Sequence, residues 1–143
     1  MSQPSGRRYG QQRRTRRQGE TSDIRGMQMD KRTFVDAIRV AVQDAAVVGT
    51  ISMLRGPPGR KPEEDSLVLS AWFNGLSFRD RQKVELVIQQ TAEAAVFGFL
   101  CVLDGVRAIE NGLVKGELDL RYRQGAVDVR LNDTSGDELH DLL

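Results

Sequence analysis

Four polar residues in the C-terminal half of the chain belong to types that carry out acid–base chemistry or bind ions. Asp104, Arg107 and Glu110 follow one another at three-residue steps, which places them on one face if this segment is helical. His140 is the only histidine. A catalytic site would form only if the fold brought these groups together. We expect structural ion pairs as their principal role, and an enzyme with a carboxylate/arginine site is kept as an alternative.

The sequence contains no recognisable motif for a metal or a catalytic nucleophile. Cys101 is the single cysteine, lacks cysteine or histidine neighbours at metal-ligand spacing, and is interpreted as a small core residue. A metal site at His140 would need ligands from elsewhere in the chain, since its neighbours Asp137, Glu138 and Asp141 are typical of a solvated acidic surface. We therefore expect no metal, no other cofactor and no enzymatic activity.

Arginines are concentrated at the N-terminus. Residues 1–26 hold seven arginines against two carboxylates, a charge of +5, so residues 27–143 carry −4 of the total of +1. Clustered guanidinium groups bind phosphates without sequence specificity. Candidate nucleic-acid contacts in this segment are Arg13, Arg14, Arg16 and Arg17. Because the rest of the chain is acidic, nucleic-acid association through this segment is an alternative and not the main hypothesis.

The same N-terminal segment has few large hydrophobic side chains. It cannot bury enough apolar surface to offset the entropy of ordering, so residues 1–28 are predicted to be a disordered tail. Met27 and Met29 stand just before the first periodic segment, and either could be the true initiator, which would place the upstream stretch outside the native protein. A single domain is expected over residues 29–143.

Two helical patterns precede the longest one. The first begins after Asp30, a suitable N-cap, and runs to about Leu54. Its apolar surface is wider than one stripe, which predicts cover on two sides, by the rest of the domain or by a second subunit. The second pattern is short and ends at residues 74–75. It contains Trp72, which we interpret as a core anchor, with an exposed interface residue as the alternative.

The longest helical pattern begins at Ser77, in a sequence that resembles a capping box. From Thr91 it is apolar on all sides, which predicts a central, buried helix. A break at residues 104–105 would leave 106–111 as a short final helix. The nearly uncharged stretch 91–103 is shorter than the roughly 20 residues that cross a bilayer. No secretory signal is recognised, so we expect a cytoplasmic protein without a membrane span.

After the helices, hydrophobicity alternates with a period of two. Residues 117–123 and 127–131 predict a β-hairpin with one apolar and one charged face. Arg121 and Arg123 lie on the charged face and are candidate partners for the acidic residues named first. Residues 137–143 predict a terminal helical turn that packs leucines inward.

These patterns predict an α+β fold, mainly α, with three to four helices, a long central helix and a C-terminal antiparallel hairpin. The predicted function is a small non-enzymatic module that binds a protein or assembles as a homodimer. A bacterial immunity or antitoxin-like inhibitor would fit this size and charge. Candidate partner-binding residues are Trp72, Asp104, Arg107, Arg121 and Arg123.

Overall fold

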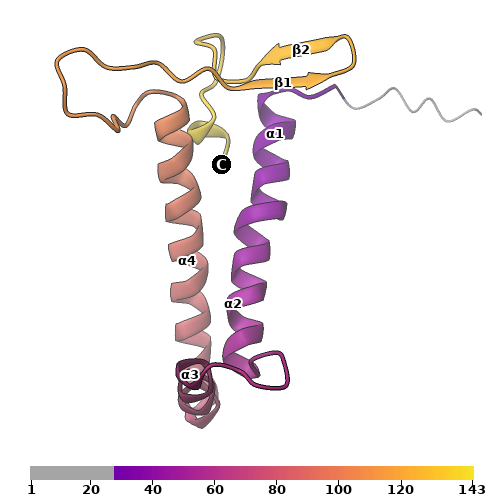
Figure 1. Cartoon of the computed structure of the whole chain (residues 1–143), viewed down its shortest axis with the longest axis vertical. Coiled ribbons are helices and arrows are strands. Elements are labelled where there is room, and N and C mark those ends of the chain that lie inside the picture. Colours follow the sequence, from indigo (N-terminus) through magenta and orange to yellow (C-terminus); the bar gives the residue numbers. More distant parts are fainter. Residues whose placement is uncertain (1–27) are drawn as a thin grey trace, which may run out of the picture.

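The computed structural model describes residues 28–143. The predictions of a disordered tail and of nucleic-acid contacts at its arginines lie outside these residues. Two long helical segments run side by side in opposite directions, a third helix crosses one end, and the β-hairpin and the C-terminus lie at the other end (Figure 1). The predicted class, α+β and mainly α, is confirmed. We call the hairpin end, with the C-terminus, the head.

The first long segment is continuous but not uniform. It consists of α1 (Lys31–Ile38), η1 (Arg39–Asp44) and α2 (Ala45–Arg55). The Asp30 carboxylate accepts a hydrogen bond of 2.7 Å from the amide of Thr33, which confirms the predicted N-cap. The middle piece is a π-helical turn, a rare feature that the sequence pattern did not predict. It contains Gln43, one of the few buried polar side chains among the described residues.

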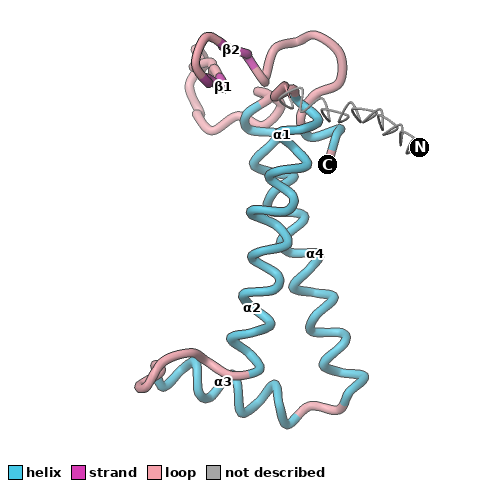
Figure 2. The backbone as a smooth tube through the Cα atoms, turned by 90° about the vertical axis from the view of Figure 1, so that its right-hand side faces the viewer, coloured by secondary structure: helices cyan, strands magenta, loops and turns pink. Residues whose placement is uncertain are grey.

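The return segment begins after a loop with two prolines. Helix α3 (Glu64–Gly75) crosses the lower end, and α4 (Phe78–Leu103) runs back to the head. Ser77 caps α4, since its hydroxyl oxygen accepts a 3.2 Å hydrogen bond from the amide of Asp80. A view turned by 90° shows α2 and α4 diverging toward the end where α3 lies (Figure 2).

Helix α4 ends where predicted, but residues 106–111 directly after it do not form a helix. Gly105 has φ +77°, in the left-handed region that glycine adopts without strain. The amide of Arg107 then bonds the carbonyl of Cys101 at 3.0 Å, which folds the chain back over the helix end. The predicted short helix over residues 106–111 is therefore wrong: these residues form bends and extended chain. Their side chains are consequently not arranged at helical spacing.

The two strands of the hairpin are shorter than the sequence stretches of alternating hydrophobicity that predicted them. Strands β1 (Arg121–Gln124) and β2 (Val127–Arg130) pair antiparallel, with Tyr122 opposite Val129. Gly125, at φ +58°, makes the turn. Just below the strands, the amide of Leu131 bonds the carbonyl of Leu120 at 2.8 Å, and Leu131 is buried. Leu120 packs against the buried side chains of α1, α4 and the C-terminal segment, which joins the base of the hairpin to the helices.

The main hydrophobic core lies in the head. Its buried members come from α1, α4 and the C-terminal segment: Val35, Val96, Leu100, Leu139 and Leu142. The last two confirm the predicted inward packing of the terminal leucines, and Cys101 is buried as expected. At the opposite end, Phe73 of α3 is fully buried. The fold therefore has a small core in the head and a second packed site at the end where α3 lies.

Most of the long helical surface lies outside these cores. In α4 the buried residues are confined to the C-terminal third, Val96, Gly98, Leu100 and Cys101, so the prediction of a buried helix from Thr91 onward is wrong. No third layer of the described chain covers the outer side of α4. Phe97 and Phe99 are 43% and 59% exposed.

By length and composition alone, two segments are apolar enough to cross a membrane. They are Lys31–Arg55 and Phe78–Leu103, and 6% and 22% of their most apolar windows are buried. Soluble proteins contain core helices that satisfy the same criterion. The expectations of a cytoplasmic location and of no membrane span therefore stay predictions.

Candidate functional site

The end of α4 brings the first of the candidate residues into the head. Asp104 is the C-terminal cap of α4, and its side chain is 4% exposed. Its carboxylate oxygen Oδ2 accepts a 3.0 Å hydrogen bond from the amide of His140, and it lies 2.9 Å from Nδ1 of the same residue. The C-terminal turn thus holds the histidine against the end of the long helix, across 36 positions of sequence.

The neighbours Asp137 and Asp141 are exposed, as the sequence predicted, but His140 itself is largely buried. Its side chain is 14% exposed, and the Phe97 ring meets the imidazole edge-on, with centroids 5.6 Å apart. The hydrogen bond that His140 donates to Asp104 raises the pKa of His140, against the opposing effect of desolvation, and the charges of Asp141 and Glu138 raise it further. Asp104 also fixes the ring, because Nδ1 points to it.

Two further carboxylates approach the imidazole. Glu138 Oε2 lies 3.5 Å from Nδ1, and Asp141 Oδ1 lies 3.7 Å from Nε2. Donor atoms of Asp104, Glu138 and His140 all lie within 4.8 Å of one another. One imidazole is therefore surrounded by three carboxylates. We call Asp104, Glu138 and His140 the head cluster.

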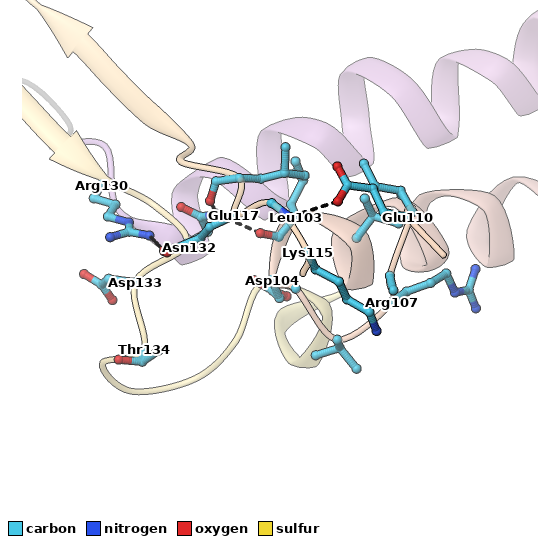
Figure 3. Close-up of a pocket in the computed structure, with 17 residues that line it drawn as sticks. Leu103, Asp104, Arg107, Glu110, Lys115, Glu117, Arg130, Asn132, Asp133 and Thr134 are labelled. Atoms are coloured by element: carbon cyan, nitrogen blue, oxygen red, sulfur yellow. Dashed lines mark hydrogen bonds and ion pairs between the residues drawn. The ribbon is translucent and has the colours of Figure 1, made fainter. Parts of the chain in front are cut away.

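Two cavities flank the head cluster. One, of about 710 Å³, lies between the end of α4, the loop that follows it and the base of the hairpin, and it is lined by Asp104, Arg107 and Glu110 (Figure 3). The other, of about 550 Å³, lies over α4 and is lined by Arg107, His140 and Phe97. Of the four candidate residues, only Arg107 lines both cavities.

The four candidate residues are thus neighbours but not one constellation. Asp104 and His140 are in contact, whereas Glu110 turns to its own loop, where its Oε2 accepts a 2.9 Å hydrogen bond from the amide of Gly116. The Arg107 guanidinium packs over Gly98, where a Cβ would lie 2.6 Å from Nη1. Gly98 therefore leaves room for this arginine.

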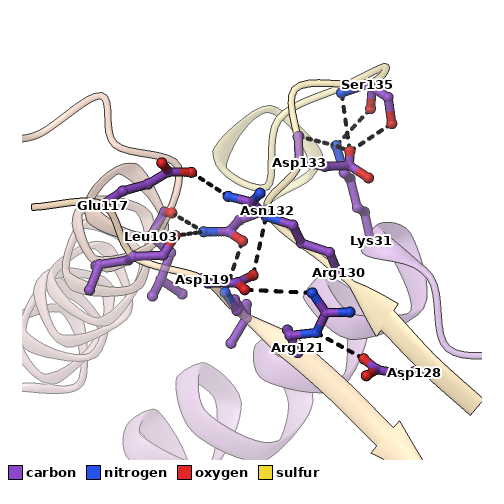
Figure 4. Close-up of polar contacts among 12 residues, drawn as sticks. Lys31, Leu103, Glu117, Asp119, Arg121, Asp128, Arg130, Asn132, Asp133 and Ser135 are labelled. Carbon is purple, nitrogen blue, oxygen red and sulfur yellow. Dashed lines mark hydrogen bonds and ion pairs between the residues drawn. The ribbon is translucent and has the colours of Figure 1, made fainter.

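The hairpin arginines form ion pairs within their own neighbourhood. Arg121 Nε lies 2.9 Å from Asp128 (Figure 4). Arg123 Nε lies 3.3 Å from the same carboxylate. Asp119 contacts Arg121 at 3.6 Å and Arg130 at 3.2 Å. The predicted pairing of Arg121 and Arg123 with the acidic residues after α4 is therefore wrong. These pairs are exposed, so each contributes little to stability.

Asn132 connects the hairpin base to α4. Its amide Nδ2 donates to the carbonyls of Leu103 and Leu118, both at 2.7 Å, and its Oδ1 accepts from the amide of Leu120 at 2.9 Å (Figure 4). The Leu103 carbonyl belongs to the last turn of α4, where no intrahelical donor remains. One side chain therefore satisfies three backbone groups from two segments. Nothing in the sequence distinguished it from other asparagines.

Lys31 ties the start of α1 to the C-terminal segment. Its ammonium group donates to the carbonyls of Asp133 and Ser135, both at 2.7 Å, and pairs with the Asp133 carboxylate at 2.9 Å (Figure 4). Hydrogen bonds from the Ser135 hydroxyl and from Lys31 lower the pKa of Asp133 to about 2. The charged carboxylate is thus favoured in the folded state.

This lowered pKa predicts a pH-dependent contribution to stability. The contribution is complete above the ordinary value of 3.8 and is lost as the pH falls through about 2. We expect Asp133→Asn to destabilise the protein at pH 5, with a smaller difference from the unaltered chain at pH 2.5. Urea unfolding at both pH values measures this. Asp137→Asn is the control, and a difference for Asp133→Asn that does not change with pH contradicts the prediction.

Trp72 is half-exposed and not a core anchor. Its side chain is 51% exposed, whereas its neighbour Phe73 is fully buried and anchors α3. The core interpretation of Trp72 is therefore wrong, and it belongs to the apolar surface that the helices leave open. Apolar content alone could not distinguish the two rings, because consecutive helix residues point about 100° apart.

No family model matches the chain, and neither the curated proteins nor the solved structures contain a match. A functional argument therefore rests on the residues described above.

Proposed function

We propose that the protein is a small, non-enzymatic assembly module that forms a homodimer through the outer surfaces of its long helices. The observation that supports this is the number of large apolar side chains on the helices that are 43–70% exposed. On the two long segments they are Val40, Val42, Val48, Met53, Phe78, Leu86, Val87, Phe97 and Phe99. On α3 they are Leu67, Val68, Leu69 and Trp72.

The extent of this apolar surface fits a protein interface. The thirteen side chains are spread along both long segments and α3, and each is at least 43% exposed. The largest exposed apolar patch of a typical monomer covers about 300–600 Å², and a stable interface buries about 800 Å² from each partner. A second copy would cover part of this apolar surface.

The shape of α2 also fits a second helix. Ala45 and Gly49 stand four residues apart and are exposed, on the side of the helix away from the partly buried Val47 and Ile51. Ala41, four residues earlier in η1, is also exposed. No atom lies within 4 Å of a Cβ built at Gly49, so this side is open. Small residues in such a row let a neighbouring helix approach closely. A pair of antiparallel helices that meets its own copy around a two-fold axis would give a closed four-helix bundle.

A membrane is the competing environment for the same helices, and charge placement favours the dimer. Asp44 stands near the middle of Lys31–Arg55, and Glu93 stands within the apolar part of α4; both are exposed. A charged residue at the centre of a bilayer costs about 2.5–3.5 kcal/mol on an insertion scale. At the rim of a water-soluble interface such residues keep their hydration.

Light scattering with size-exclusion chromatography tests the proposal. At tens of micromolar, the full chain is expected to show twice the 16.0 kDa mass of one chain. Val48→Glu should raise the dimer dissociation constant at least about 10-fold, because it buries a charge next to the row of small residues. Val48 is 64% exposed, and glutamate favours helices, so the fold should tolerate the change.

Val114→Glu is the matched control, since Val114 is 90% exposed in a loop outside the proposed interface. This variant should remain dimeric. A monomeric unaltered chain, or equal dimerisation of the two variants, would overturn the proposal. Flotation of the full chain with phospholipid vesicles would favour the membrane instead. An inhibitor of the immunity or antitoxin type is one role that such a module would serve.

A further inference from the structure

We propose that the head cluster, Asp104, Glu138 and His140, binds a divalent transition-metal ion of the Zn²⁺ class. His140 Nδ1 lies 2.9 Å from Asp104 Oδ2 and 3.5 Å from Glu138 Oε2, and all three donor atoms lie within 4.8 Å of one another. Zn²⁺ binds histidine nitrogen and carboxylate oxygen at about 2.0–2.2 Å. An ion between the three donors therefore requires only small movements of their side chains.

The third ligand of the proposed site is distant in the sequence and is brought to the other two by the fold. Glu138 and His140 are near neighbours in the C-terminal turn, and the third donor arrives from the end of α4, 36 positions away from His140. Asp104 is held by the hydrogen bond from the His140 amide, and its side chain is 4% exposed. Two of the three donors are thus positioned by the packed core of the head before any ion binds, which limits the loss of entropy on binding.

The charge of the head cluster also favours a cation. Asp104 lies at the C-terminal end of α4, where the helix dipole adds negative potential. Among the described residues, its carboxylate is hydrogen-bonded only through Oδ2 and only by His140, so Oδ1 receives no donor. The nearest arginine along the chain, Arg107, places its guanidinium over Gly98. Among the described residues, His140 is therefore the only basic side chain that pairs with these two carboxylates.

The composition of the ligand set indicates the class of ion. Ca²⁺ and Mg²⁺ prefer six or more oxygen ligands, whereas one imidazole with two carboxylates suits Zn²⁺ and related transition ions. Three protein ligands leave one position of a four-coordinate ion for water or another small ligand. The approach from solvent is on the Glu138 side, because that side chain is 46% exposed.

His140 permits a direct test because it is the only histidine in the chain. The full chain, without histidine tag, is titrated with Zn²⁺ at pH 7.5 while the imidazole nitrogens are followed by ¹⁵N NMR. The expected result is a change in the Nδ1 resonance that saturates at one equivalent, with a single binding site by calorimetry. An unchanged imidazole signal in excess Zn²⁺ overturns the proposal.

Two variants that each remove one negative charge distinguish a defined metal site from nonspecific electrostatic attraction of cations. Glu138→Gln should weaken Zn²⁺ binding at least about 10-fold, because it removes a ligand while leaving the buried part of the cluster intact. Asp137→Asn removes the same charge from an adjacent exposed position outside the ligand set, and it should stay within about 2-fold of the unaltered chain. Equal weakening by both variants overturns the site. Circular dichroism confirms that both variants are folded.

Discussion

Replacing Leu100 with alanine is expected to lower the free energy of unfolding by about 2–5 kcal/mol, the range for a large-to-small change in a packed core. Leu100 is 0% exposed and packs in the hydrophobic core of the head with Val35, Val96, Leu139 and Leu142. With so few members, this core has little capacity to close around a cavity. Urea unfolding followed by circular dichroism at 222 nm, at one fixed protein concentration, measures the change.

Leu113→Ala is the matched control for this experiment. The chemical change is the same, but Leu113 is fully exposed in the loop after α4. Its effect should remain within about 0.5 kcal/mol. A similar loss for both variants would show that the head does not depend on this core. The fixed concentration matters because dimerisation would add to the apparent stability.

The second large effect is expected from Asn132→Leu. The change keeps a similar volume but leaves the carbonyls of Leu103 and Leu118 and the amide of Leu120 without their present partner. A buried polar group without a partner costs about 1–3 kcal/mol, and because these groups are partly open to water we expect a total of about 2–4 kcal/mol. Amide exchange at Leu120 should accelerate as the hairpin base loosens.

Asn111→Leu provides the comparison, since Asn111 is exposed and its side chain forms no hydrogen bond within residues 28–143. Its unfolding free energy should change by less than about 0.5 kcal/mol. If Asn132→Leu were equally mild, water would be replacing the asparagine at the hairpin base, and the joint between hairpin and helices would not depend on this side chain.

The head and the long helices differ in the kinds of side chain that they bury and expose. The head combines the buried core, the Asn132 joint and the cluster at His140, so its polar groups are held in defined positions. The long helices combine exposed valines, leucines and phenylalanines with few buried contacts. Phe97 lies on the exposed helical surface and also against His140, so the proposals of metal binding and of dimerisation are tested at residues that belong to only one of them. We predict that Val48→Glu does not alter Zn²⁺ binding and that Glu138→Gln does not alter dimerisation.

Several features could be predicted from the sequence because their causes are local. Asp30 and Ser77 accept hydrogen bonds from amides three residues ahead, so a short stretch of sequence is enough to place the start of each helix. Gly105 and Gly125 adopt positive φ at the end of α4 and at the hairpin turn. Alternation of apolar and charged residues identified the hairpin, although its strands are shorter than the pattern.

Other predictions failed because burial depends on which neighbours the fold provides. Periodicity predicted that α4 would be buried from Thr91, but among the described residues only the α1–η1–α2 segment lies along its length, and residues such as Phe99 stay exposed. Trp72 and Phe73 are equally apolar in sequence, and only their directions relative to the packed helices separate them. The stretch 106–111 has helical spacing, but the left-handed turn at Gly105 sends it over the helix end instead.

The four candidate residues, Asp104, Arg107, Glu110 and His140, show the same difference between local and tertiary causes. The sequence by itself determined that α4 ends at Asp104 and that a terminal turn carries His140, since caps, glycine and local spacing are short-range properties. Only the tertiary structure decided that these two residues meet while Glu110 does not join them. Contact between positions 36 apart depends on the path of the intervening loop and hairpin and on the burial of Leu139 and Leu142, which no local pattern encodes.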